Sequence, residues 1–168
     1  MLPRFRTKRL LLRPRTMRDF ADCLAMDRDP DVTRHVAGPW GDPERHERFL
    51  RQRIRADFGP GLGYWTVATE GAPDTFLGWV MLIPEDGTGP EVEIGWRFCR
   101  RAWGRGYATE AARPVLAHGF RTLGLARIVA AIAPGNAASI RVAEKIGLRP
   151  APGGQAYAAT CDDHAGRG

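Results

Sequence analysis

The chain has 168 residues, enough for one compact domain and too few for two of ordinary size. Its 43% hydrophobic and 26% charged residues are ordinary for a globular protein. The net charge of +6 suits an anionic partner, but nearly all the cations are arginine, which a GC-rich genome would also produce. These arginines are scattered rather than interleaved with aromatics on one face, so we expect no nucleic-acid-binding surface.

The three cysteines, Cys23, Cys99 and Cys161, lie far apart and form no CxxC or Cys/His cluster. This spacing excludes a disulfide scaffold or a zinc site and fits a reducing compartment. The first residues lack the apolar stretch of a signal peptide or membrane span. We therefore expect a cytoplasmic protein with no metal and no membrane partner.

The first part of the chain predicts one strand and two helices. Weak alternation over residues 8–13 indicates the strand, and Thr16 can cap a helix that runs to about residue 28. The run Asp42-Pro43-Glu44 combines a cap, a proline at the first helical position and a first-turn acid. The second helix should extend to residue 58, where Gly59-Pro60-Gly61 ends it. It carries Phe49, Ile54 and Phe58 among many arginines, so we expect an amphipathic helix with these residues on its apolar face.

The rest of the chain predicts strands and helices in alternation. In order, we expect three strands, a long helix, an apolar strand and a last helix, at residues 64–69, 75–83, 91–98, 106–123, 125–133 and 136–146. Gly147 should cap the last helix. A meander of strands that leads into a βαβ crossover predicts a single α/β domain with a mixed sheet and helices on both faces.

The glycine-rich turn at residues 103–108 carries the chemistry. A strand ends there and a helix begins at once, so main-chain N–H groups and the positive end of the helix dipole meet at one point. Three arginines add positive charge beside the turn: Arg100, Arg101 and Arg105. This combination indicates a pyrophosphate-binding loop.

Two other phosphate-binding motifs are excluded. The dinucleotide fingerprint needs an acid about 20 residues on, at the end of the next strand, where this chain has Ile132-Ala133-Pro134. A P-loop needs Gly-Lys-Ser/Thr, which does not occur. A glycine-rich turn without a ligand is the remaining structural alternative.

The run WGRGYATEA resembles the acetyl-CoA motif of the GNAT acetyltransferase superfamily, in the form used by the ribosomal-protein N-terminal acetyltransferases. A second run, PGNAASIRVAEKIGL from residue 134, is similar to the signature of the same branch, and TKRLLLRPRTMRDF resembles its first strand and helix. The likeness covers roughly residues 5–149. It implies a GNAT domain over residues 1–150, with a mostly antiparallel sheet that splays into a V. The residues that follow, 151–168, are expected to form an irregular tail.

The resemblance also implies acetyl-CoA as the acyl donor and a set of residues that bind it. The main chain of Arg97, Phe98 and Cys99 should hold the pantetheine arm, and Asn136 should contact the same arm or simply cap the last helix. The other residues expected to contact the cofactor belong to the glycine-rich loop or precede it: Arg101, Gly104, Arg105, Gly106, Tyr107, Ala108 and Thr109.

The implied reaction is direct transfer of the acetyl group to an amine in a ternary complex. Many GNAT enzymes carry a tyrosine acid where this chain has Ala143, and Ser139 is the substitute implied by the branch. Alternation along the central strand at 91–98 puts Glu91, Glu93 and Arg97 on one face and the apolar side chains on the other. Glu93 is a candidate base that would act through water. The structural alternatives are a capping or solvent-facing serine and an ion pair between the glutamate and an arginine from a helix. Cys99 has no neighbouring base and is interpreted as a packed small residue.

After Leu148 the family usually continues into two more strands, whereas this chain offers one candidate, residues 155–161, and a tail that looks disordered. An uncovered edge would favour pairing with a second copy, so a homodimer is one expectation. The acceptor is expected to be a protein N-terminus or a small-molecule amine. A non-catalytic acyl-CoA-binding module is the alternative from another functional class.

Overall fold

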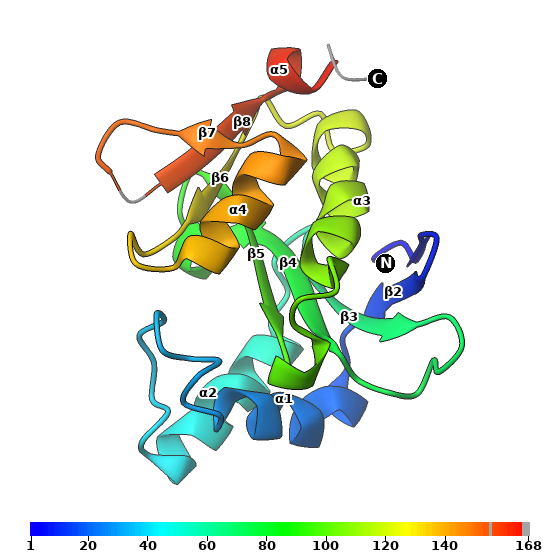
Figure 1. Ribbon diagram of the computed structural model, residues 1–168, viewed down its shortest axis with the longest axis vertical. Coiled ribbons are helices and arrows are strands. Elements are labelled where there is room, and N and C mark those ends of the chain that lie inside the picture. The colour runs from blue at the N-terminus through cyan, green and yellow to red at the C-terminus, as the bar shows by residue number, and fades with distance from the viewer. Residues whose placement is uncertain (155, 166–168) are drawn as a thin grey trace.

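The computed structural model describes residues 1–154 and 156–165. Over these residues the chain forms one eight-stranded sheet in the order β1-β2-β3-β4-β5-β6-β8-β7 (Figure 1). The strands are β1 (Phe5–Arg6), β2 (Leu10–Pro14), β3 (Gly63–Thr69), β4 (Gly78–Pro84), β5 (Val92–Phe98), β6 (Arg127–Ala131), β7 (Arg149–Pro150) and β8 (Ala156–Thr160). Neighbouring strands are antiparallel except β5 and β6, which are parallel. The expected mixed, mostly antiparallel sheet is confirmed.

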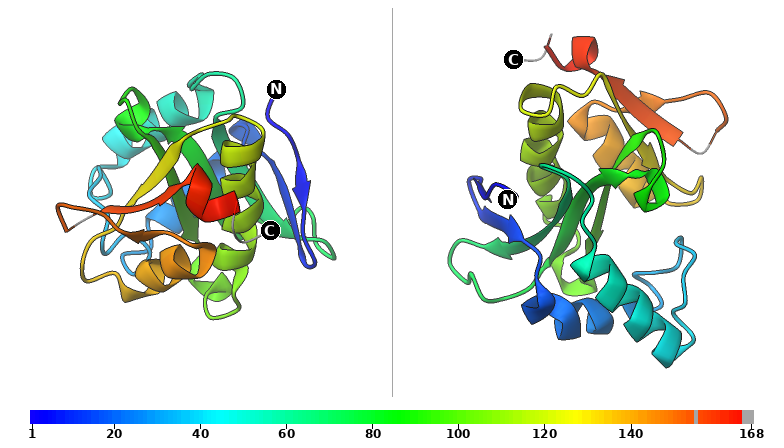
Figure 2. Two further views of the ribbon diagram at one scale, coloured as in Figure 1. Left: turned by 90° about the horizontal axis from the view of Figure 1, so that it is seen from above. Right: turned by 180° about the vertical axis from the view of Figure 1, so that it is seen from behind.

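Helices cover both faces of the sheet, as expected (Figure 2). The α-helices are α1 (Phe20–Asp27), α2 (Pro43–Arg55), α3 (Tyr107–Arg121), α4 (Ala137–Ile146) and α5 (Cys161–Ala165). Short 3₁₀ turns lie at η1 (Met17–Asp19), η2 (Glu85–Gly87) and η3 (Arg100–Ala102). Helices α3 and α4 lie on one face, whereas α1 and α2 lie on the other.

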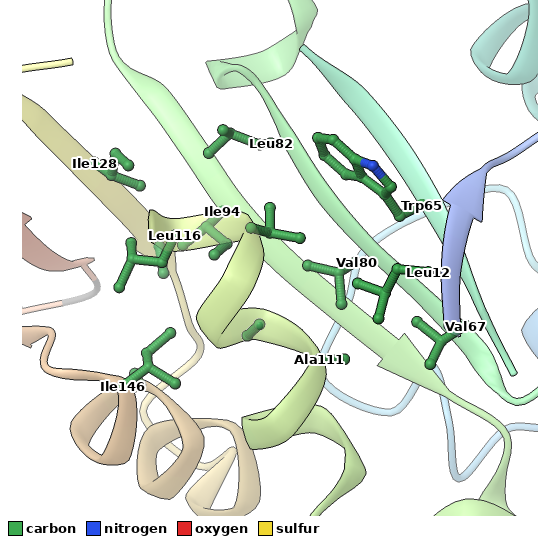
Figure 3. Packing of buried hydrophobic residues seen from close by; sticks show 14 of the residues in the cluster. Leu12, Trp65, Val67, Val80, Leu82, Ile94, Ala111, Leu116, Ile128 and Ile146 are labelled. Carbon is green, nitrogen blue, oxygen red and sulfur yellow. The ribbon is translucent and has the colours of Figure 1, made fainter. Parts of the chain in front are cut away.

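Each face of the sheet has its own apolar cluster. The larger cluster packs Val80, Leu82 and Ile94 from the central strands against α3 and α4, which contribute Leu116 and Ile146 (Figure 3). The smaller cluster packs other strand residues against α1 and α2, with Tyr64, Trp79, Ile83, Cys23 and Leu50 among its members. The alternation of β5 residues between these layers follows the predicted pattern. The core therefore fixes which β5 side chains face each helix pair.

The sheet splays between β5 and β6. Seven pairs join β4 to β5, from Pro84↔Val92 to Gly78↔Phe98, but β5 and β6 share only Glu93↔Val129. Beyond that pair the carboxyl-terminal half of β5 has no strand partner on the β6 side among the described residues. This is the V-shaped opening that the resemblance implied, and it lies directly before the glycine-rich loop.

The helix caps form as predicted, but two helix descriptions need correction. Thr16 and Asp42 both accept hydrogen bonds at helix starts. Helix α2 ends at Arg55, three residues before the expected end, because Ala56 is already extended. The buried face of α2 contains His46 and Leu50, whereas Phe49, expected on the apolar face, is exposed.

The tail departs most from expectation. Residues 156–160 form β8, which pairs with β6 along five residues, and β7 completes the sheet. The short β7 strand was not predicted, and α5 occupies part of the segment expected to be disordered. Gln155 and residues 166–168 lie outside the described residues. The chain thus continues its own sheet past β6, so a second copy is not needed there.

No helix in the described part of the chain is long and apolar enough to cross a membrane.

Candidate active site

A cleft of about 700 Å³ lies beside the splay between β5 and β6. Four segments line it: the loop between α1 and α2 (residues 31–36), the end of β5, the glycine-rich loop with the start of α3, and helix α4. In Figure 1 the α1–α2 loop reaches toward the turn between β6 and α4, which places it over one side of the opening. A Cβ at Gly135 in that turn would lie 3.6 Å from Cε1 of His35.

The glycine-rich loop presents unpaired main-chain donors to this cleft. Gly104 and Gly106 have φ of +73° and +75°, a left-handed conformation that other residues adopt at a cost. The N–H of Trp103 donates to the carbonyl oxygen of Arg100, and the N–H of Glu110 donates to that of Gly106. The six main-chain amides between them, at 104–109, have no hydrogen-bond partner among the described residues. A Cβ at Gly104 would meet nothing within 4 Å. This donor set at the start of α3 fits the pyrophosphate of a nucleotide cofactor.

The open edge of β5 supplies further main-chain groups, with one change from expectation. Cys99 N–H donates to Leu77 O at 2.8 Å, so its amide faces the β4 side and is already bonded. The N–H and C=O groups of successive residues point to opposite sides along an antiparallel strand. Those of Arg97 therefore also point toward β4, whereas those of Trp96 and Phe98 point toward the splay. Phe98 O accepts from Nε1 of Trp103 at 2.9 Å. The main-chain groups of Trp96, which was not predicted, therefore face the splay together with those of Phe98.

Most of the predicted site residues line the cleft, namely Arg97, Phe98, Gly104, Gly106, Tyr107, Ala108, Thr109, Asn136 and Ser139. Four do not: Glu93, Cys99, Arg101 and Arg105. Cys99 and Arg101 instead line a second hollow of about 330 Å³, and the Arg101 guanidinium donates to the carbonyl of Phe76. Burial raises the pKa of the Cys99 thiol, although Arg101 partly opposes this. This is the opposite of an activated nucleophile and fits the packed-residue interpretation.

Helix α4 brings three kinds of group to the cleft. Asn136 caps the helix, because its Oδ1 accepts from Ser139 N–H at 3.2 Å. The hydroxyl of Ser139 takes no part in this bond. Arg141 and Lys145, one turn apart, add positive charge to the same wall. Ala143, in the position of the family tyrosine, is fully buried in the larger cluster and presents no acid.

Glu93 lies on β5 at its pair with Val129, directly before the splayed end, on the side-chain face it shares with Arg97. Burial raises the pKa of this half-buried carboxyl, main-chain hydrogen bonding at Ala131 opposes the shift, and the charge of Glu85 adds to it. Glu91 on the same face forms an ion pair with Arg127, with Oε1 and Nη1 2.6 Å apart. The ion-pair alternative therefore applies to Glu91, and its arginine comes from β6 rather than from a helix.

A buried polar chain beneath the cleft was not predicted. Oδ2 of Asp27 lies 3.0 Å from Nε2 of His46, and Oδ1 lies 2.8 Å from Nη1 of Arg97. The Arg97 guanidinium also contacts the rings of Trp40 and Trp79, each centroid 5.0 Å from its central carbon. The pair Asp27–His46 links α1 to α2, and Arg97 joins both helices to the strand that lines the cleft.

The comparisons with known proteins agree with this arrangement. The family model described as an acetyltransferase (GNAT) domain matches residues 9–149. The uncharacterized protein YkkB of Bacillus subtilis is 39% identical over 84% of this chain and 83% of its own. The FsC-acetyl coenzyme A-N(2)-transacetylase of Aspergillus fumigatus is 32% identical over 87% of this chain and 65% of its own.

A crystal structure of an acetyltransferase from Agrobacterium tumefaciens superposes with a TM-score of 0.77 at 29% identity, over 95% of each chain. GNAT acetyltransferases take the acetyl group from acetyl-CoA, and the donor set at the start of α3 fits its pyrophosphate. The chain belongs to the GNAT family and is an acetyl-CoA-dependent acetyltransferase.

Proposed function

We propose that this enzyme transfers the acetyl group from acetyl-CoA directly to a primary amine while both substrates are bound. The observation that carries the proposal is the run of six unpaired amides at 104–109 beside the open edge of β5. One end of this arrangement can hold the pyrophosphate. The other offers main-chain groups of Trp96 and Phe98 to a thioester that lies in the splay.

In the proposed step the amine nitrogen attacks the thioester carbonyl carbon, a nitrogen–carbon bond forms and the carbon–sulfur bond breaks. The amine loses one proton, which Glu93 accepts through water, and the departing sulfur gains one, which Ser139 supplies. Both roles are assigned from position: Ser139 lines the cleft, and Glu93 shares the strand face of Arg97, which also lines it. Cys99 is not part of the step, because its thiol is buried and its pKa is raised.

The charge of the side chains that line the cleft indicates which class of amine the enzyme would accept. The cationic side chains that line it are Arg34, Arg97, Arg141 and Lys145, against one acid, Asp31. That acid is already paired with Arg34 at 2.7 Å and Arg100 at 2.9 Å. A polycationic amine would find no free carboxylate among these lining residues. We therefore favour a protein N-terminus, as in the ribosomal-protein branch, or a small amine of low charge over a polyamine.

The proposal is tested by titrating the protein with acetyl-CoA and then measuring thiol release with a panel of amines. The variant Gly104→Asp places a carboxylate on the phosphate-binding loop, and Gly124→Asp is its matched control. Gly124 has φ of +66°, and a Cβ there also meets nothing within 4 Å, so backbone strain is similar in both variants.

We expect Gly104→Asp to abolish measurable binding, whereas Gly124→Asp should bind like the wild type. Equal affinity in both variants would place the cofactor elsewhere. Tight binding without turnover on any amine would favour the non-catalytic acyl-CoA-binding module.

A further inference from the structure

A carboxylate lies one helical turn behind the phosphate-binding loop. Glu110 is in the first turn of α3, and its N–H donates to Gly106 O at 3.1 Å. The negative charge of Glu110 would repel an anion bound at the start of the helix, because the two charges lie within one helical turn of each other. The fold must therefore offset this acid if the loop is to bind a pyrophosphate.

The amino-terminal hairpin supplies that offset from more than 100 residues away. Thr7 Oγ1 donates to Glu110 Oε1 at 2.6 Å, and Arg9 N–H donates to the same oxygen at 2.9 Å. The Arg9 side chain contacts the other oxygen: Nε donates a hydrogen bond to Oε2 at 2.7 Å, and Nη2 lies 2.7 Å from the same atom. Three hydrogen bonds and one further ion-pair contact, all from two residues, thus converge on one carboxylate.

Arg9 also contacts the loop itself. Its guanidinium lies over the ring of Tyr107, 4.7 Å from the centroid, and its Nη2 lies 3.5 Å from the point where a Cβ at Gly106 would be. Arg9 O accepts from Glu70 N–H at 2.9 Å, which fixes the main chain beside β3. The cation is therefore held in place by its own strand as well as by its partner.

We propose that Arg9 is a cofactor-positioning residue, which neutralises Glu110 and thereby makes the start of α3 electrostatically able to hold the pyrophosphate of acetyl-CoA. Arg9 does not line the cleft, so it acts through the loop and the acid rather than by contact with the acceptor. This inference rests on the proposed function, since it concerns the affinity of the same loop for the same ligand.

The state of Glu110 is consistent with this role. Partial burial alone would raise its pKa, but the hydrogen bonds from Thr7 and Arg9 outweigh burial, and the pKa is lowered. Glu110 is therefore ionised at neutral pH, so removing Arg9 would leave a full negative charge behind the phosphate-binding loop.

The test is a titration of four proteins with CoA: the wild type, Arg9→Gln, Glu110→Gln and the double variant. Arg9→Gln keeps a hydrogen-bond donor and loses the charge, so we expect affinity for CoA to fall about five- to tenfold at low salt. The loss should shrink at high salt, where the unpaired charge is screened. The double variant should return toward the wild-type affinity, and Glu110→Gln alone should bind CoA at least as well as the wild type.

Arg6→Ala is the control, because Arg6 forms an exposed pair with Glu70 on the same hairpin, at 3.2 Å, and should leave affinity unchanged. A contact that merely ties the hairpin to α3 predicts a different pattern, in which Glu110→Gln and the double variant bind CoA as weakly as Arg9→Gln. That pattern, or an unchanged affinity in Arg9→Gln, would overturn the proposal. Failure of the wild type to bind CoA would instead refute the proposed function.

Discussion

The Nη1 atom of Arg97 lies 2.8 Å from Oδ1 of Asp27, so a buried ion pair joins the strand that lines the cleft to helix α1. The second oxygen of the same carboxylate contacts His46 of α2 at 3.0 Å. One side chain, 4% exposed, therefore connects two helices and the central strand. The loop between these helices forms a wall of the cleft, so Asp27 helps to determine its shape.

Asp27→Asn should destabilise the protein strongly. The substitution leaves the Arg97 cation buried without its counter-charge, and losing one partner of a buried pair costs about 3–5 kcal/mol. We expect a decrease of this size in the free energy of unfolding, measured by urea denaturation. Glu70→Gln, which breaks the exposed pair with Arg6, should change it by less than about 1 kcal/mol. A similar decrease in the free energy of unfolding in both variants would show that the buried Asp27 pair stabilises the protein no more than the exposed pair does.

Asp19 should make stability depend on pH in the acid range. Burial raises the pKa of this carboxyl, but hydrogen bonds from Arg13, Thr16 and Thr66 outweigh burial and lower the pKa. The stabilisation is therefore complete above the unfolded pKa of about 3.9 and is lost as pH falls from there through the lower folded pKa. Asp19→Asn should flatten the free energy of unfolding over that window, as measured by urea denaturation at a series of pH values. An unchanged slope would contradict this assignment.

Local sequence could predict the phosphate-binding loop, because its chemistry depends on consecutive residues. Glycines at 104 and 106 and the helix that follows are adjacent in the chain, so the unpaired amides are implied by the sequence itself. The buried chain from Asp27 to His46 and Arg97 spans 70 residues, and only the packing of α1 and α2 on the sheet brings it together.

Two other differences depend on strand pairing. Alternation predicted the side-chain faces of β5, but the direction of its amides depends on the register with β4, where Cys99 bonds to Leu77. The missed β7 has two residues, Arg149–Pro150, too few for any alternation to be visible. It is identified only by its pairing with β8, through Arg149↔Ala158 and Pro150↔Tyr157.

Glu93→Gln should remove the acid limb of the pH–rate profile. Burial raises the pKa of Glu93, so a base at this position becomes protonated, and kcat/KM falls, at a pH above the ordinary carboxyl value of about 4.3. Loss of a general base should lower kcat/KM about 100-fold at neutral pH.

The matched control is Glu91→Gln, because Glu91 shares the strand face and is paired with Arg127. This variant should keep the profile of the wild type. If Glu93→Gln retained the same acid limb, another group would have to be the base.

Ser139→Ala should separate catalysis from folding. The cap of α4 uses the N–H of Ser139 and the side chain of Asn136, so alanine keeps this bond and the helix. If the hydroxyl protonates the departing thiolate, kcat should fall at least about 100-fold, within the range of general acid catalysis, whereas KM for acetyl-CoA should stay nearly constant.

Asn136→Ala is the structural counterpart and should lower the free energy of unfolding by about 1 kcal/mol, because it removes the cap. Ser139→Thr keeps a hydroxyl and should retain most of the rate. The measurement is steady-state thiol release at saturating amine, with urea denaturation of each variant in parallel. A normal kcat in Ser139→Ala would mean that the proton reaches the sulfur from water or from the acceptor, and that the serine only lines the cleft.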